Sequence, residues 1–102
     1  MRYMDFDQLM DEYQPGSHDD DWTWSQEFEE LLSVHVDQLD RLSEDIQVNG
    51  ILQPILLGDD GRVWDGHHRI VVAFGLGFEE VPVENPREHH ERMNNVRPTI
   101  DT

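Results

Sequence analysis

The 102-residue sequence contains no cysteine and no lysine. Without cysteine the protein can form no disulfide bond, no thiolate zinc site and no cysteine-based nucleophile. No apolar run approaches the roughly 20 residues that a membrane-spanning helix needs, and the start of the chain lacks the apolar core of a signal peptide. We therefore expect a cytoplasmic protein that does not interact with a membrane.

Apolar residues are also scarce, at 36% of the chain. A chain of this length is enough for one domain and too short for two separate cores. The hydrophobic pattern predicts an α+β fold in three parts. These are an acidic, aromatic helical extension over 1–33, a core over 34–84 and a poorly ordered tail over 85–102.

Positive charge is the third scarcity. Seven basic residues, all arginine, face 23 acidic residues, and the formal net charge is −16. Such a surface repels a phosphate backbone, so direct DNA binding is not expected. Three interpretations remain open: an acidic surface that only keeps the protein in solution, one that binds a basic protein partner, or one that mimics nucleic-acid charge.

The first 33 residues carry two helical patterns. Apolar residues spaced three and four apart predict a helix over 5–13. A second helix is expected over 22–32, where Thr23 and Gln26 have the spacing of a capping box. Between them, the run from His18 to Asp21 could hold a divalent cation or could simply be solvated. Trp22 and Trp24 could cover the domain behind them or bind a partner.

The core pattern begins with a short strand predicted at 34–36 and a helix over 39–49 that Gly50 ends. A buried strand over 51–57 and a returning strand over 62–65 are joined by a hairpin turn at 58–61. A helix follows Gly66, burying residues that include Phe74, and ends at Gly77. A last short strand is expected at 81–83.

Several motifs in this core resemble the ParB/sulfiredoxin superfamily. They are the Asn-Gly-Ile-Leu-Gln-Pro-Ile run at 49–55, Asp-Gly-His-His-Arg at 65–69, Leu-Gly at 76–77 and Val-Pro-Val at 81–83, which occur in the expected order. This resemblance implies a small mixed sheet with flanking helices, here in a small, acidic, stand-alone member.

The resemblance implies a nucleotide site around the second of these motifs. In related proteins the turn binds nucleotide phosphates, and a tight turn before a helix also exposes unpaired backbone N–H groups. Phosphate oxygens would therefore contact Gly66, His67, His68 and Arg69, with Gln53 and Pro54 lining the pocket. Arg69 could instead pair with a carboxylate such as Asp65 or Glu44.

Asp65 has two competing interpretations. Beside a phosphate-binding turn its carboxylate could hold Mg²⁺, the expected cofactor, and act in catalysis. It could equally cap the helix that follows. Free-serine kinase relatives place a general base directly after a histidine near the first strand. Here that position is Val36, so only Asp37, one residue further on, could take the role.

Two positions depart from the family pattern. His67 stands where sulfiredoxins carry their catalytic cysteine, which excludes their repair chemistry, and His68 stands where many ParB proteins have arginine. Our leading prediction is Mg²⁺-dependent nucleotide binding, with phosphoryl transfer or NTP hydrolysis as the reactions that such a site could support. The alternative is a non-catalytic protein of a phage or mobile element that binds a basic or DNA-binding host protein. A ParB-like nuclease is the third candidate.

Overall fold

The computed structural model describes residues 2–18 and 21–95, which form five helices and a five-stranded mixed sheet. The predicted α+β class is therefore confirmed. In chain order the elements are β1 (Arg2–Asp5), α1 (Phe6–Glu12), β2 (Gln14–Pro15), α2 (Trp24–Val34), α3 (Val36–Asn49), β3 (Ile55–Leu57), β4 (Arg62–Asp65), α4 (His67–Leu76), β5 (Glu80–Glu84) and α5 (Pro86–Asn95).

The sheet has the strand order β1-β5-β3-β4-β2. Strand β1 pairs antiparallel with β5, β5 runs parallel to β3, β3 and β4 form a hairpin, and β2 runs parallel to β4. Both edge strands thus come from the N-terminal segment. We expected a helical extension beside the core, whereas this segment contributes two strands to the sheet itself.

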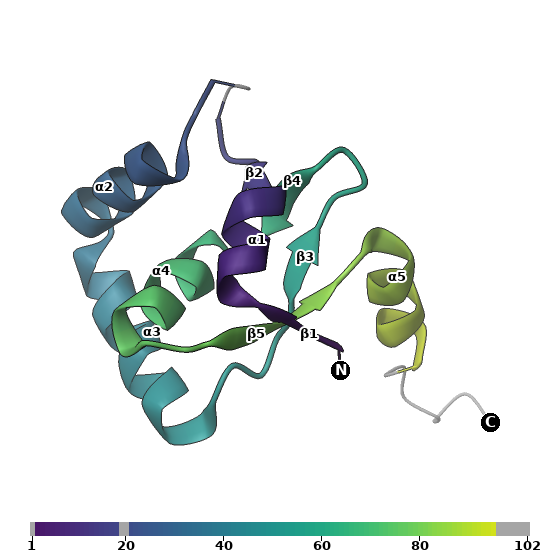
Figure 1. Ribbon diagram of the computed structural model, residues 1–102. Helices are drawn as coiled ribbons and strands as arrows, with labels where there is room; N and C mark the ends of the chain where they lie inside the picture. The colour runs from purple at the N-terminus through teal and green to yellow at the C-terminus, as the bar shows by residue number, and fades with distance from the viewer. Residues whose placement is uncertain (1, 19–20, 96–102) are drawn as a thin grey trace.

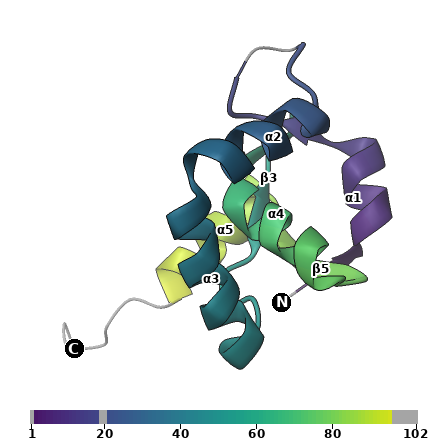
Figure 2. The same ribbon diagram turned by 90° about the vertical axis from the view of Figure 1, so that its left-hand side faces the viewer.

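The helices lie on both sides of the sheet. Helices α2, α3 and α4 gather on one side and α5 lies on the other (Figures 1 and 2). The main core joins α1 to the sheet and to α4, and its buried members are Phe6, Leu9, Ile55, Leu57, Val63, Ile70, Ala73, Val81 and Val83. A second cluster joins α2, α3 and α4 through Leu31, Leu39, Ile46, Val71 and Val72.

Local sequence signals account for most helix ends. The Asp5 carboxylate accepts a hydrogen bond from the Gln8 backbone N–H and begins α1. The capping box predicted at Thr23 and Gln26 begins α2, which satisfies backbone donors that have no partner within the helix. Helix α4 ends at Gly77, which has φ 75°, a conformation that glycine adopts without steric cost.

Three expectations for the core are wrong. Residues 34–36 form no strand, because α2 continues to Val34 and α3 begins at Val36 after a single residue, His35. The strand expected over 51–57 is confined to β3, and Leu52 is 64% exposed. Phe74 was expected to be buried but is 62% exposed, since its ring lies at the edge of the core beside those of Phe6 and Phe28.

The predicted poorly ordered tail is wrong for residues 86–95, which form helix α5; residues 96–102 lie outside the described residues. Ion pairs to the preceding strand hold this helix in place. The Glu84 carboxylate, only 7% exposed, accepts two hydrogen bonds of 2.9 Å from the Arg92 guanidinium and lies 2.6 Å from Nδ1 of His89. The alternating charges of this segment indicated only that it is polar, and they did not indicate that the buried Glu84 would be its partner.

We expect Arg92→Ala to destabilise the protein by about 1–3 kcal/mol, because it leaves the buried Glu84 carboxylate short of hydrogen bonds. The Arg92 guanidinium, followed by His89, holds the pKa of Glu84 below its usual value. The resulting stabilisation is complete above the unfolded pKa of about 4.3 and is lost as the pH falls through the lower folded pKa. Urea unfolding from pH 7 to pH 3 should therefore show a smaller acid-induced loss in the variant.

Arg87→Ala is the matched control for this experiment. Arg87 lies on the same helix, and its side chain is 85% exposed and pairs with the exposed Glu91. Its replacement should change the free energy of unfolding by less than about 0.5 kcal/mol. Equal effects of the two substitutions would contradict a specific role for the Glu84–Arg92 pair.

Candidate functional site

A cleft of about 730 Å³ opens between the start of α4, the helices α2 and α3, and the loop after β2. It is lined by all five residues of the Asp-Gly-His-His-Arg motif. Its polar lining consists of Ser17, His18, Glu27, Glu30, His35, Asp45, Gln53, Asp65, Gly66, His67, His68 and Arg69. The tertiary structure therefore joins the predicted turn to residues from the N-terminal segment.

Gly66 forms the tight turn between β4 and α4 that the motif predicts. It is buried, with φ 110° and ψ 17°, and a Cβ there would lie 3.0 Å from the Ile55 side chain. Both its backbone conformation and its surroundings therefore require glycine. The helix starts directly after it without a side-chain cap, so the predicted capping role of Asp65 is wrong.

Arg69 points back across this turn. Its Nη2 lies 3.4 Å from Oδ2 of Asp65, and its Nη1 donates to the backbone carbonyl and side-chain oxygen of Gln53 at 3.3 Å each. The Arg69 side chain is 13% exposed, whereas that of Asp65 is 74% exposed. Of the two carboxylates considered from the sequence, Asp65 is therefore the partner. The pair is long and its carboxylate is solvated, so a phosphate could replace it at small cost.

Burial disfavours the protonated form of both histidines of the motif. Burial lowers the pKa of His67, although Glu27 and Asp65 partly oppose the effect. The Gly16 backbone N–H donates to Nε2 of His67 at 3.1 Å, which requires that nitrogen to be unprotonated. Burial, followed by the neighbouring His35, likewise lowers the pKa of His68. Within residues 2–18 and 21–95, nothing forms a hydrogen bond with the buried Nε2 of His68.

Glu27 is the principal cleft residue that the sequence analysis missed. It is 2% exposed, although it lies in the first turn of an otherwise amphipathic helix. Its Oε1 accepts hydrogen bonds from the Ser17 hydroxyl at 2.5 Å and from the Trp22 indole N–H at 2.7 Å. An acidic residue in the first turn of a helix is expected because it interacts favourably with the helix dipole. The sequence therefore gave no sign that Glu27 is buried.

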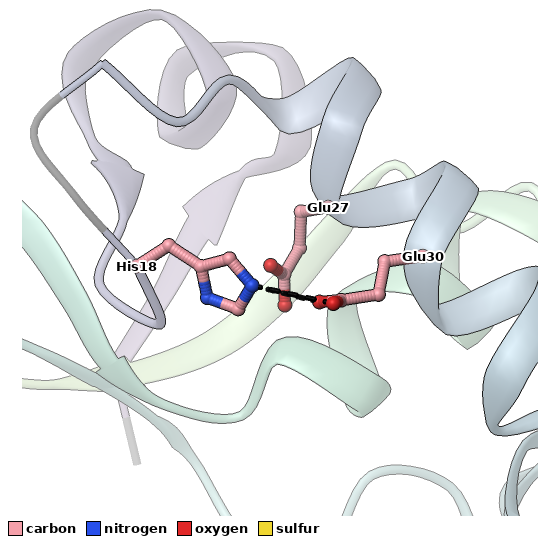
Figure 3. A group of neighbouring side chains, drawn as sticks. All are labelled: His18, Glu27 and Glu30. Carbon is pink, nitrogen blue, oxygen red and sulfur yellow. Dashed lines mark hydrogen bonds and ion pairs between the residues drawn. The ribbon is translucent and has the colours of Figure 1, made fainter.

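His18, Glu27 and Glu30 bring their ligand atoms within 4.8 Å of one another (Figure 3). The two glutamates project from successive turns of α2, and His18 approaches from the loop after β2. From the sequence, His18 could either hold a cation with the aspartates that follow it or simply be solvated, and of these aspartates Asp19 and Asp20 lie outside the described residues. The structure instead pairs it with Glu30, at 3.0 Å between Nε2 and Oε2.

The other predicted site residues lie elsewhere. Asp37 is exposed in the first turn of α3, and Pro54 is buried and does not line the cleft. Trp22 and Trp24 are only partly exposed, and the indole N–H of Trp24 donates to the Tyr13 carbonyl at 2.7 Å. Both tryptophans therefore contribute to intramolecular packing, one of the two interpretations that the sequence left open.

None of the described helices is both long and apolar enough to cross a bilayer. The chain matches no family model. It is similar to the uncharacterized protein ORF326b of Acidianus two-tailed virus, with 34% identity over 64 residues. That match covers 63% of this chain and 19% of the viral protein, so the chain spans about a fifth of its relative's length. Membership of the ParB/sulfiredoxin superfamily stays a prediction.

Proposed function

We propose that this protein binds a nucleotide in the cleft, with its phosphates at the turn from Gly66 to Arg69 and with a divalent cation. The observation that supports this most is that the first turn of α4, including Arg69, lines one cleft. The backbone N–H groups of that turn have no partners within the helix, and Arg69 adds a guanidinium suited to phosphate oxygens. The cleft volume is within the range of small-molecule sites.

The charge of the cleft makes a cation necessary. Among the described residues that line it, four carboxylates accompany one guanidinium, and the carboxylates belong to Glu27, Glu30, Asp45 and Asp65. A polyphosphate entering without counterions would be repelled by this excess of negative charge. Mg²⁺ would reverse the balance by bridging phosphate oxygens to a carboxylate, and the exposed Asp65 is the proposed ligand from the motif. Phosphoryl transfer or NTP hydrolysis would then require an acceptor or water beside this ion.

We expect Arg69→Ala to weaken nucleotide binding about 10- to 150-fold, since a hydrogen bond to a charged group contributes about 1.5–3 kcal/mol. Isothermal titration of ATP, ADP, CTP and GTP in the presence of Mg²⁺ would measure this effect and identify the preferred base. Omission of Mg²⁺ should also weaken binding, because the carboxylates would then face the phosphates directly.

Arg87→Ala provides the control for lost positive charge, since this exposed arginine lies on α5, outside the cleft. It should leave the affinity for the preferred nucleotide unchanged. Thermal unfolding should show that both variants remain folded. Absence of heat with all four nucleotides, or equal binding by wild type and Arg69→Ala, would contradict the proposal.

A non-catalytic interaction protein is the second candidate. It is favoured by the net charge of −16 and by the similarity to a viral protein, which agrees with the expected phage or mobile-element context. Such a protein would bind a basic partner, and added salt would weaken that complex by screening exposed charges. Its binding would not depend on Arg69, which separates it from the nucleotide proposal.

A further inference from the structure

We infer that His18, Glu27 and Glu30 form a binding site for one divalent transition-metal ion such as Zn²⁺. The three side chains carry the ligand types that bind such ions, an imidazole and two carboxylates. They come from two separate segments, and Figure 3 shows them pointing toward one another. This site is distinct from the Mg²⁺ site proposed at Asp65, and it does not depend on nucleotide binding.

The spacing of the ligand atoms suits a single ion. Zn–N and Zn–O distances of about 2.0–2.1 Å place the ligand atoms of a tetrahedral site about 3.3 Å apart. One pair is already close to this separation, with 3.0 Å between Nε2 of His18 and Oε2 of Glu30. All three ligand atoms lie within 4.8 Å of one another, so small side-chain rotations would complete the geometry.

Glu27 has one carboxylate oxygen available to a cation. Both of its hydrogen bonds are made by Oε1, and Oε2 accepts none from the described part of the chain. The side chain as a whole is 2% exposed, but Oε2 is not among the buried polar atoms that lack a partner, so this oxygen is accessible from the cleft that Glu27 lines. No arginine of the described segments forms an ion pair with Glu27, so an ion in the cleft would provide the missing positive charge.

Surrounding residues hold the proposed ligands in position. Ser17 and Trp22 both donate to Oε1 of Glu27 and so fix the carboxylate, as outer partners do in metal sites. The Arg62 guanidinium donates to the His18 backbone carbonyl and thereby anchors the loop that carries the imidazole. Three protein ligands would leave at least one coordination position for water or for an anionic group entering the cleft.

A calorimetric titration of Zn²⁺ alone into the protein tests this inference. We expect one saturable site per chain, weakened at least about 10-fold by each of His18→Ala, Glu27→Gln and Glu30→Gln, because loss of an outer partner alone costs about 10- to 100-fold. Glu29→Gln is the matched control on the same helix, where the side chain is exposed, and His90→Ala is the control for an exposed imidazole. Both controls should bind Zn²⁺ as the wild type does.

The Glu27→Gln variant keeps the shape of the side chain, and circular dichroism should confirm that each variant is folded. Absence of a saturable one-to-one site would overturn the inference. So would wild-type Zn²⁺ affinity in both folded His18→Ala and Glu30→Gln, since the ion would then be bound by other acidic or histidine residues. Because no nucleotide is present, failure of the nucleotide proposal would not affect either result.

Discussion

Leu9→Ala should lower the free energy of unfolding by about 2–5 kcal/mol. Leu9 is 0% exposed and belongs to the main core, although it lies on α1 in the segment that we expected to be an extension. Truncation would remove buried methyl groups and leave a cavity between α1, the sheet and α4, which cannot close fully. A domain of this size is typically stable by about 5–15 kcal/mol, so the loss would be a large share of the total.

Chemical denaturation in urea measures this effect, and Gln8→Ala is the control on the same short helix. Gln8 is exposed, and only its backbone N–H takes part in the cap. Its replacement should change stability by less than about 0.5 kcal/mol. If Leu9→Ala cost less than about 1 kcal/mol, α1 would not be an integral part of the core.

Gly16→Ala should destabilise the protein by at least about 1–3 kcal/mol and also abolish Zn²⁺ binding. A Cβ at Gly16 would lie 2.1 Å from the Val63 carbonyl oxygen, which is backbone and cannot rotate away. The chain would have to separate from β4, breaking the short parallel pairing of β2 and the hydrogen bond from Gly16 to His67. Ser17 and His18 would then leave the cleft.

Gly75→Ala is the control for Gly16→Ala, because it replaces a glycine with alanine at a position where the Cβ has room. Gly75 lies inside α4, and apart from its chain neighbours and the adjacent backbone of the helix no atom lies within 4 Å of a Cβ placed there. Alanine should therefore stabilise the helix by about 0.5–1 kcal/mol, opposite in sign to the effect at Gly16. Thermal unfolding and Zn²⁺ titration of the two variants provide the comparison. A stable Gly16→Ala protein that binds Zn²⁺ normally would show that β2 does not position His18.

The features predicted correctly from the sequence depend on neighbours within a few residues. The capping box at Thr23 and Gln26, the turn at Gly66 and the helix end at Gly77 each follow from hydrogen bonds or backbone conformations within one turn. The hairpin between β3 and β4 is similarly local, because four polar and glycine residues connect it. These signals located the part of the cleft from Asp65 to Arg69.

The features that were missed depend on partners distant in the chain. Strands β1 and β2 have only four and two residues, and each exists because a distant strand supplies its hydrogen bonds. Helix α5 similarly has a partner at the other end of the chain, because Glu88 forms an ion pair with Arg2 at 2.7 Å. A short polar segment carries no periodicity that reveals such a partner, so the pattern favoured a loop or a tail.

The sequence by itself therefore determined an acidic α+β protein with a tight glycine turn before a helix that carries Arg69. Only the tertiary structure placed the N-terminal segment at both edges of the sheet and brought His18, Glu27 and Glu30 together beside that turn. The physical reason is that capping and turn geometry are local, whereas the convergence of side chains from separate segments is set by packing of the whole core.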